Sequence, residues 1–245
     1  MTMVHKVLIQ HASCQDMYQY PLISCIMPTN AARRDFIPLA ILYFQRQNYL
    51  NIELVILDDG IGTIENLVPD VYNIRYYKTS RKLSTGAKRN LACEHAHGEY
   101  ILNWDDDDWY APDWIKQQVN ALQQSGADIC GLKDLYFYCP SEQAAWKYRY
   151  YNSKRDWVAG ATMAYRRSHW QRYPYKDMQV GEDNDFAWNS KGKVFAHSYI
   201  DGFVSMLHGN NTSPKNTKSW QKQDVAIIEQ ILKNDMHFYK SMQTR

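Results

Sequence analysis

Two apolar runs of strand length, separated by a segment with helical spacing, constrain the fold of this chain most. The runs are residues 22–27 (LISCIM) and 53–57 (ELVIL), and the first is closed by Pro28, Thr29 and Asn30. Over residues 35–46 apolar side chains recur at helical spacing, and we expect Asp35 to cap that helix. A strand, a helix and a strand with short connections form a βαβ unit, whose strands are parallel. The chain is therefore predicted to build on a parallel sheet.

The pattern continues as alternating strands and helices. Residues 74–77 and 100–104 are predicted strands, and residues 85–97 are a predicted amphipathic helix with Gly98 at its C′ position. Pro112 opens a further helix, which Gly126 ends. The second half is less regular, and its expected elements are strands over 129–132, 135–138, 146–151 and 158–165 and helices over 182–190 and 220–239. We expect a mixed sheet there.

Length and composition narrow the class of protein. The 245 residues are predicted to form a single domain. The formal net charge is only +2, so no global field favours nucleic acid as a partner. The chain has no apolar run long enough for a transmembrane helix and no secretory pattern, so we expect a soluble, cytoplasmic protein. The five cysteines lack a CxxC spacing and are expected to be reduced: Cys14, Cys25, Cys93, Cys130 and Cys139.

Four consecutive aspartates, residues 105–108, follow the predicted strand over 100–104 and are called the aspartate run below. Like charges this close raise one another's pKa and destabilise the fold unless a cation joins them. In an extended segment Asp105 and Asp107 point one way and Asp106 and Asp108 the other, so one pair can converge on an ion. Oxygen ligands favour Mg²⁺ or Mn²⁺.

The aspartate run has two other interpretations. A solvated acidic turn that caps the Pro112 helix is the structural alternative, because aspartates favour helix N-termini. An EF-hand calcium loop that starts at Asp105 would need Gly at its sixth position and Glu at its twelfth, where this chain has Tyr110 and Lys116. The calcium loop is therefore disfavoured.

Four segments, taken in order, resemble the successive motifs of family 2 glycosyltransferases. They are LISCIMPTN, ELVILDDG, GAKRNLACEHAHGEYILNWDDDDWYAPDW and GEDNDF, and the resemblance spans residues 22 to about 213. It implies an α/β fold of the GT-A type, with a Rossmann-like, mostly parallel central sheet flanked by helices and a mixed sheet on the acceptor side. Residues 20–126 would bind the nucleotide sugar, and residues 127–245 would contribute the acceptor site and the catalytic base.

The resemblance also implies an activity, namely inverting, metal-dependent transfer of a sugar from a nucleotide-diphosphate sugar to an acceptor hydroxyl. The QxxRW motif of processive synthases is absent, so we expect a single sugar to be added. The implied setting is polysaccharide or glycoconjugate biosynthesis, with a saccharide or glycoconjugate acceptor and peripheral association where that acceptor is lipid-linked.

The donor side of the implied site involves several predicted residues. Asp58 or Asp59 would hydrogen-bond the nucleotide base, and Pro28 and Thr29 would line the same pocket. The remaining assignments are Asp105 at the ribose, Asp106 in the nucleotide-sugar site, Asp107 with Asp105 at the Mn²⁺ or Mg²⁺ ion, and Lys88 and Arg89 at a phosphate or base. For Lys88 and Arg89 a role on the helix surface is an equal alternative.

An acceptor hydroxyl attacks poorly without a base, so the implied mechanism needs a carboxylate near it. Gly181-Glu182-Asp183 resembles the family element that holds the base, and we rank Asp183 ahead of Glu182, with Asp185 third. The alternative is that these acids only cap a helix.

Two further groups are candidates on the acceptor side. His208 is predicted to contact the metal or diphosphate, although a lone histidine is often structural. Tyr136, Trp146, Tyr148 and Trp157 are candidates for stacking an acceptor sugar, with core packing as the alternative.

The chain departs from the family pattern at Asn30-Ala31, where many members have Tyr-Asn, and at Ile61, where many have Ser, which leaves the nucleotide open. A nucleotidyltransferase is the enzymatic alternative, but residues 29–34 (TNAARR) contain no glycine for a phosphate loop. A non-catalytic carbohydrate-binding protein of the same fold is the other alternative.

Overall fold

The computed structural model describes residues 20–151, 154–213 and 215–241. Cys14 and the N-terminal segment considered above for a secretory signal lie outside the described residues. Within these ranges no helix has both the length and the apolar character needed to cross a bilayer.

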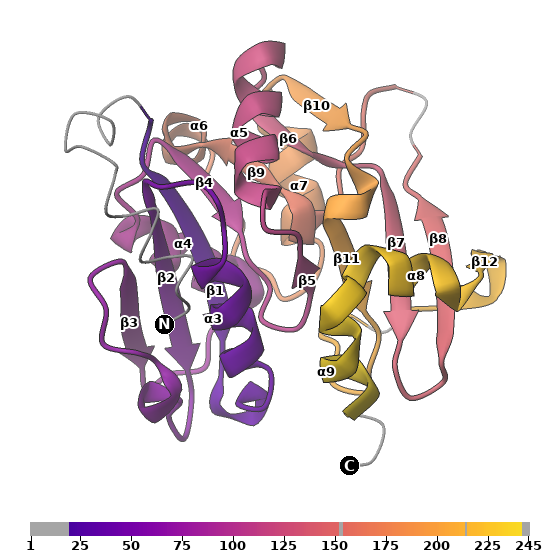
Figure 1. Ribbon diagram of the computed structural model, residues 1–245. Helices are drawn as coiled ribbons and strands as arrows, with labels where there is room; N and C mark the ends of the chain where they lie inside the picture. The colour runs from indigo at the N-terminus through magenta and orange to yellow at the C-terminus, as the bar shows by residue number, and fades with distance from the viewer. Residues whose placement is uncertain (1–19, 152–153, 214, 242–245) are drawn as a thin grey trace.

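A seven-stranded sheet forms the centre of the molecule, in the order β10-β6-β9-β4-β1-β2-β3 (Figure 1). Strands β1, β2, β3 and β4 are parallel, as the βαβ pattern predicts, and β9 is antiparallel to both of its neighbours. The strands are β1 (Ile23–Thr29), β2 (Ile52–Asp59), β3 (Ile74–Thr79), β4 (Tyr100–Asn103), β6 (Ile129–Leu132), β9 (Ala164–Arg166) and β10 (Val194–His197).

A second sheet of five strands, in the order β12-β8-β7-β11-β5, is mixed, as expected for the second half. Its β7 and β11 are parallel and its other pairs are antiparallel. The strands are β5 (Trp109–Tyr110), β7 (Asp134–Cys139), β8 (Ala144–Arg149), β11 (Phe203–Met206) and β12 (Gln221–Gln223).

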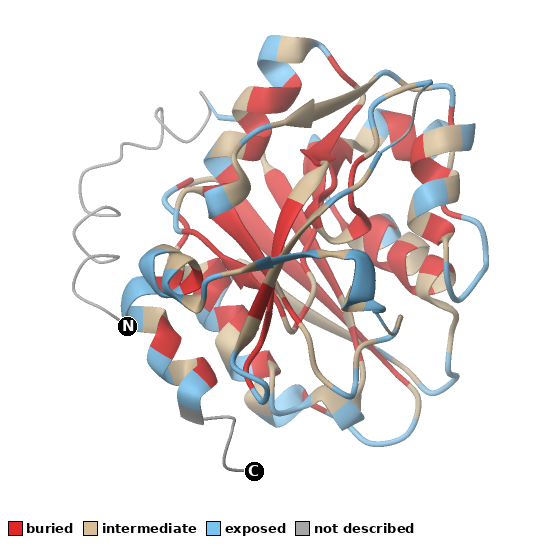
Figure 2. Cartoon of the chain, turned by 90° about the vertical axis from the view of Figure 1, so that its right-hand side faces the viewer, coloured by how far each residue is buried: buried red, intermediate tan, exposed pale blue. Residues whose placement is uncertain are grey.

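Helices cover both faces of the seven-stranded sheet because its strands are apolar on both sides. In β1, Cys25 and Met27 belong to the core under α3 and α5, whereas Ile26 belongs to the core under α4, α6 and α7. Figure 2 shows the buried strands enclosed by helices whose outer faces are exposed. The helices are α3 (Ile37–Gln45), α4 (Thr85–His95), α5 (Trp114–Ser125), α6 (Arg167–Arg172), α7 (Glu182–Asn189), α8 (Val225–Leu232) and α9 (Met236–Ser241).

Four local predictions were wrong. Asp35 does not cap α3, whose N-cap is Phe36. Gly98 is not a helix C′ residue, since α4 ends at His95 and the Gly98 amide donates instead to Ser24 Oγ on β1, at 2.8 Å. Of residues 158–165 only the last two are in a strand, because residues 160–162 form the 3₁₀ helix η3 (Gly160–Thr162). Residues 220–239 are not one helix but contain β12, α8 and the start of α9, with the 3₁₀ helix η6 (Lys233–Asp235) between the two α-helices.

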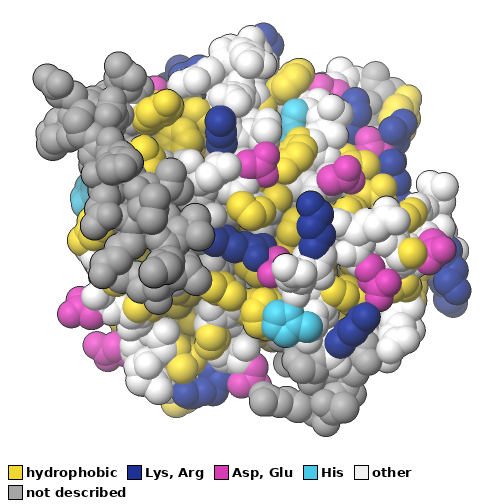
Figure 3. Space-filling view, in the orientation of Figure 1, with side chains coloured by type: hydrophobic (Ala, Val, Ile, Leu, Met, Phe, Trp, Pro, Cys, Tyr) yellow, Lys and Arg dark blue, Asp and Glu magenta, His cyan; other side chains and the backbone are white. Residues whose placement is uncertain are grey.

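The cysteines and the surface charges of the described residues agree with the composition. Cys25, Cys93, Cys130 and Cys139 are free and buried. On the face seen in Figure 3, basic and acidic side chains are interspersed instead of gathered by sign. This distribution agrees with the small net charge.

Candidate active site

The carboxyl ends of β1, β2 and β4 meet at one edge of the central sheet. Parallel register places Thr29 beside Asp58 and Ile26 beside Asn103, so the segments that follow these strands share that edge. Ligands of open parallel sheets bind at such an edge. A cleft of about 670 Å³ lies there, and it is lined by Pro28, Thr29, Lys88, Arg89, the whole aspartate run, Glu182 and Asp183.

The aspartate run lies along the chain between Trp104 and Tyr110, whose rings stack on each other. Trp104 is fully buried, its amide donates to Ile26 O, and its indole Nε1 donates to Ala40 O. Tyr110 stacks on Trp104 with 3.9 Å between ring centroids, and its hydroxyl oxygen accepts from the Asp105 amide at 2.7 Å. These contacts fix the backbone on both sides of the acids.

Each acid of the run contacts a different part of the fold. Burial alternates along the run, with Asp106 and Asp108 buried and Asp105 and Asp107 more exposed, at 29% and 10% of the side chain. Asp106 accepts from Thr29 Oγ1 at 2.6 Å, and Asp108 accepts from the Met206 amide on β11 at 2.9 Å. The run therefore joins the central sheet, through Thr29 of β1, to the second sheet, through Met206 of β11.

Arg33, in the 3₁₀ helix η1 (Ala31–Arg33), is the principal cation at the run, and sequence reasoning missed it. Its guanidinium binds both oxygens of Asp106 at 2.6–2.8 Å and reaches Asp107 Oδ2 at 2.6 Å. Asp107 Oδ2 also contacts His208 Nε2 at 2.8 Å. The sequence signal for Arg33 is the TNAARR segment, in which two arginines lie just after strand β1.

The pKa values of the four aspartates are shifted, because the acids are buried close together beside only a few cations. Burial raises the pKa of Asp105 to about 6, with Arg89 acting in the opposite direction and Asp107 adding to the rise. Burial and the neighbouring Asp107 also raise the pKa of Asp108 well above its usual range. Burial alone would raise the pKa of Asp107 too, but the His208 hydrogen bond and the Arg33 charge lower it.

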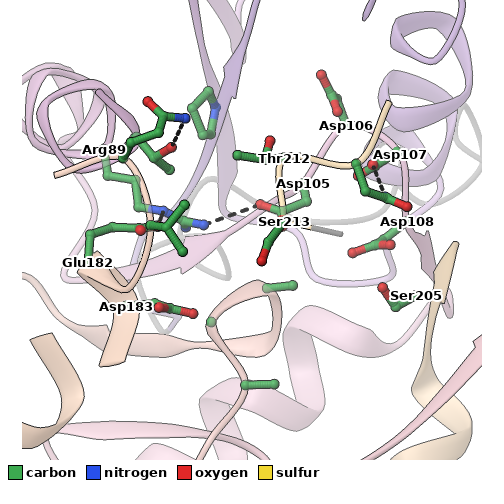
Figure 4. A pocket seen from close by; sticks show the side chains of 18 of the residues that line it. Arg89, Asp105, Asp106, Asp107, Asp108, Glu182, Asp183, Ser205, Thr212 and Ser213 are labelled. Carbon is green, nitrogen blue, oxygen red and sulfur yellow. Dashed lines mark hydrogen bonds and ion pairs between the residues drawn. The ribbon is translucent and has the colours of Figure 1, made fainter. Parts of the chain in front are cut away.

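The second acidic cluster lies at the start of α7, across the cleft from the run (Figure 4). Gly181 precedes the helix with φ of 87°, a conformation that glycine adopts without strain. Glu182 is buried, and its Oε1 lies 3.3 Å from Nε of Arg89. Asp183 is only partly buried, lines the cleft, and accepts from the Asn184 amide. The structure thus separates two acids that the sequence left nearly equivalent.

Arg89 lies between the two acidic clusters. Its Nη2 is 3.6 Å from Asp105 Oδ1, on the opposite side from Glu182. The side chain is buried, yet neither Nε nor Nη1 has a hydrogen-bond partner among the described residues. A buried guanidinium with unused donors that lines a cleft is suited to an anionic or polar ligand. The alternative interpretation, in which Arg89 lies on the helix surface, is wrong because the side chain is buried.

The two aspartates at the end of β2 lie outside the residues that line the cleft. Asp58 is fully buried and accepts from Tyr76 OH at 2.7 Å, while no described residue hydrogen-bonds to its Oδ1. Asp59 accepts from the Leu83 amide and holds Lys88 Nζ at 3.0 Å. Asp59 therefore orients a cation of the cleft, and contact of either acid with a base stays a prediction.

The residues predicted for the acceptor side do not all line the cleft. Trp157 lines the cleft, whereas Trp146 and His208 line a neighbouring cavity of about 320 Å³. Tyr136 and Tyr148 line neither, and the aromatic residues that join Trp157 at the cleft are Phe137, Tyr150 and Phe203. Successive side chains alternate across a strand, so Leu135 and Phe137 of β7 reach the cleft and Tyr136 points away. Asp185 also lies outside the cleft and pairs with Lys176.

The donor set of the aspartate run fits a hard divalent cation. Four carboxylates meet two guanidinium groups, those of Arg33 and Arg89, which leaves negative charge that a divalent ion would compensate. Among the described residues, however, no three His, Cys, Asp or Glu side chains already converge on one point. Arg33 occupies the Asp107 oxygen that such an ion would use.

The fold and cleft define an α/β protein with acids at the ends of its parallel strands, and sequence comparison gives its family. Residues 24–187 match the family described as Glycosyl transferase family 2, so the chain belongs to that family. An uncharacterized glycosyltransferase of Haemophilus influenzae is 36% identical over 110 residues, 43% of this chain and 44% of the relative. The putative colanic acid biosynthesis glycosyl transferase WcaA of Escherichia coli is 37% identical over 113 residues, 44% of this chain and 40% of the relative. The matches thus cover less than half of these relatives.

Solved structures with the same architecture are GT-A glycosyltransferases, which confirms the predicted fold. A mannosyltransferase from Pyrobaculum calidifontis, in complex with GDP-Man and Mn²⁺, has a TM-score of 0.62 at 14% identity, covering 91% of this chain and 73% of its own. TarS of S. aureus has a TM-score of 0.60 at 17% identity, covering 76% of this chain and 60% of its own. At these identities the likeness concerns the fold alone.

Proposed function

We propose that the protein transfers a single sugar, with inversion, from a nucleotide-diphosphate sugar to an acceptor hydroxyl in a metal-dependent reaction. The observation that carries the proposal is that the aspartate run and the Glu182/Asp183 pair line the same cleft, although they are far apart in sequence. Inverting transfer needs a charged group at the departing diphosphate and a base at the incoming hydroxyl. The family match supports the same class of reaction.

Asp183 is the proposed base, ahead of Glu182. A base must reach the acceptor hydroxyl, and Asp183 lines the cleft with a partly exposed carboxylate. Glu182 is buried beside Arg89, and burial raises its pKa although the Arg89 charge opposes the rise. We assign Glu182 to holding Arg89 in place.

Donor binding is assigned to the opposite wall. Mn²⁺ or Mg²⁺, held by Asp107 with Asp105 and His208 beside it, would neutralise the diphosphate charge when bound. Arg89 offers its unused N–H donors, and Lys88 is oriented by Asp59 toward the same wall. Pro28 and Thr29 line this wall at the end of β1, and Asp106 fixes Thr29 and Arg33 there.

The substrates are proposed by class. Two of the structural neighbours were solved with UDP-GlcNAc and with GDP-Man, so UDP- and GDP-sugars are the first donors to test. Phe137, Tyr150 and Trp157 provide flat apolar faces in the cleft that Asp183 also lines, which suits a saccharide or glycoconjugate acceptor. The WcaA relative supports a role in polysaccharide biosynthesis. A cytoplasmic location, and peripheral association with a lipid-linked acceptor, belong to the same proposal.

The test is sugar transfer to a panel of saccharides from UDP-, GDP-, dTDP- and CDP-sugars with Mn²⁺, the anomeric configuration of the product being determined by NMR. We expect one nucleotide class to support transfer with inversion. Asp183→Asn should lower turnover by roughly 10²–10⁴-fold. Glu182→Gln is the matched control and should retain more activity than Asp183→Asn. Retention of configuration, or undiminished transfer by Asp183→Asn, contradicts the proposal.

A further inference from the structure

Gly160, the first residue of η3, lies directly against the proposed base. A Cβ atom at Gly160 would lie 2.0 Å from Asp183 Oδ2 and 2.7 Å from Asp183 Cβ. Gly160 is not among the glycines with positive φ, so the backbone does not require glycine there. Glycine is therefore needed at this position because there is no space for a side chain. The Asp183 carboxylate occupies that space.

The turn that contains Gly160 is fixed to the strand that leads into the aspartate run. Asn103, the last residue of β4, is 1% exposed, and its Nδ2 donates to Gly160 O at 2.7 Å. The backbone N–H of Asn103 donates to Met163 O at 2.9 Å, so the end of β4 is hydrogen-bonded to both ends of the turn. Thr162 anchors the same turn from the side, where its Oγ1 accepts from the Leu132 amide of β6 at 2.9 Å.

One strand end therefore sets the place of both acidic clusters. The aspartate run begins two residues after Asn103 along the backbone. The Asn103 side chain also binds the carbonyl of Gly160, and Gly160 packs against Asp183. We propose that Gly160, held by Asn103, is a positioning residue that fixes the Asp183 carboxylate relative to the aspartate run. This inference rests on the proposed function, because it assumes that Asp183 is the base.

The expected effect follows from the reach of a base. Proton transfer needs the carboxylate within hydrogen-bond distance of the acceptor hydroxyl, and a displacement of about 1 Å can cost roughly 10²-fold in rate. In Gly160→Ala the added methyl would overlap Asp183, so the carboxylate must rotate or the start of α7 must move. We expect kcat to fall roughly 10²-fold, while the affinity for Mn²⁺ and nucleoside diphosphate, measured by calorimetry, stays at the wild-type value.

Gly131→Ala is the matched control. A Cβ at Gly131 on β6 would lie 2.9 Å from Thr162 Oγ1 and 3.1 Å from Val158 Cβ, so it strains the same turn without touching Asp183. Its turnover should stay close to that of the wild type, even where its melting temperature is lower. Equal losses of turnover in Gly160→Ala and Gly131→Ala would overturn the inference, since strain in the turn would then explain both.

The decisive readout is the effect of Gly160→Ala in an Asp183→Asn background. Asparagine has nearly the same shape but cannot act as the base, so the substitution at Gly160 should then change the residual rate little. An undiminished effect in that background shows a purely structural role and overturns the inference. Asn103→Leu, which cannot donate to the Gly160 carbonyl, should show the same dependence on Asp183 and serves where Gly160→Ala does not fold. Wild-type turnover by Asp183→Asn alone would instead mark the failure of the proposed function.

Discussion

At the scale of single residues, Arg33 is the feature that most changes the picture of the donor site. It binds Asp106 through two nitrogens and also reaches Asp107, so a protein cation occupies carboxylates that a divalent ion is proposed to use. Its Nη1 donates to Asn210 O, which ties the loop after β11 to the same cluster. In the proposed reaction the buried Asp106 would keep Arg33 as its counter-ion, and Asp107 would exchange that contact for a metal.

Arg33→Gln should bind Mn²⁺ alone more tightly than the wild type, because the competing charge at Asp107 is gone. We expect a gain of roughly tenfold, equivalent to about 1.4 kcal/mol, in calorimetric titration without nucleotide. The metal-free variant should be less stable by about 3 kcal/mol, since Asp106 loses its partner. Arg34→Gln is the control, because Arg34 is exposed and should leave both quantities unchanged. Weaker Mn²⁺ binding by Arg33→Gln would argue against competition.

The residue types of the site could be predicted from the sequence, but the position and role of each residue could not. The aspartate run and the Glu182/Asp183 pair were located from their motifs, because acids next to strand ends and helix starts are visible in sequence. Both Glu182 and Asp183 line the cleft, but Glu182 is buried against Arg89 while Asp183 is more exposed, and this contact between helices is one that no local pattern encodes. Phe137 was missed in favour of Tyr136 because the register of β7 against the cleft is set by its neighbouring strands.

At the scale of elements, helices and strands with strong periodicity were predicted well and their ends less well. Strand β6 and the start of α4 lie where the pattern indicated, and Gly126 ends α5 with φ of 61°. Gly98 was assigned to the end of α4 by the same rule, but its function is close approach to β1. Residues 220–239 include apolar side chains at helical spacing, which predicted one long helix. The α-helix ends after Leu232, however, because Lys233 has φ of 50°.

Gly98→Ala should therefore destabilise the fold by distorting the junction of α4, β1 and β4. A Cβ at Gly98 would lie 2.6 Å from Ser24 N and 2.8 Å from Leu22 O, both of which are backbone atoms that cannot turn away. We expect a loss of about 1–3 kcal/mol in the free energy of unfolding, measured with denaturant. Gly209→Ala, at a glycine with no atom within 4 Å of an added Cβ, is the control. Equal stability of the two variants would contradict the close-approach explanation.

At the scale of the whole molecule, the cleft exists because three segments converge at one edge of the central sheet. The parallel strands bring Thr29 and Asn103 to that edge, and the second sheet closes it through Met206, whose amide donates to Asp108. The βαβ pattern predicted the first part. The second part depends on pairing between β5 and β11, two short strands about 90 residues apart, which sequence periodicity does not reveal.

The central claim is that the two walls of this cleft do different work, donor binding on one and base catalysis on the other. Calorimetric titration of the donor's nucleoside diphosphate into Asp107→Asn and Asp183→Asn, with and without Mn²⁺, tests it most directly. We predict that Asp107→Asn loses the Mn²⁺-dependent part of the affinity and that Asp183→Asn keeps the wild-type Kd despite its slow transfer. Equal Mn²⁺-dependent affinity in the two variants would contradict the account.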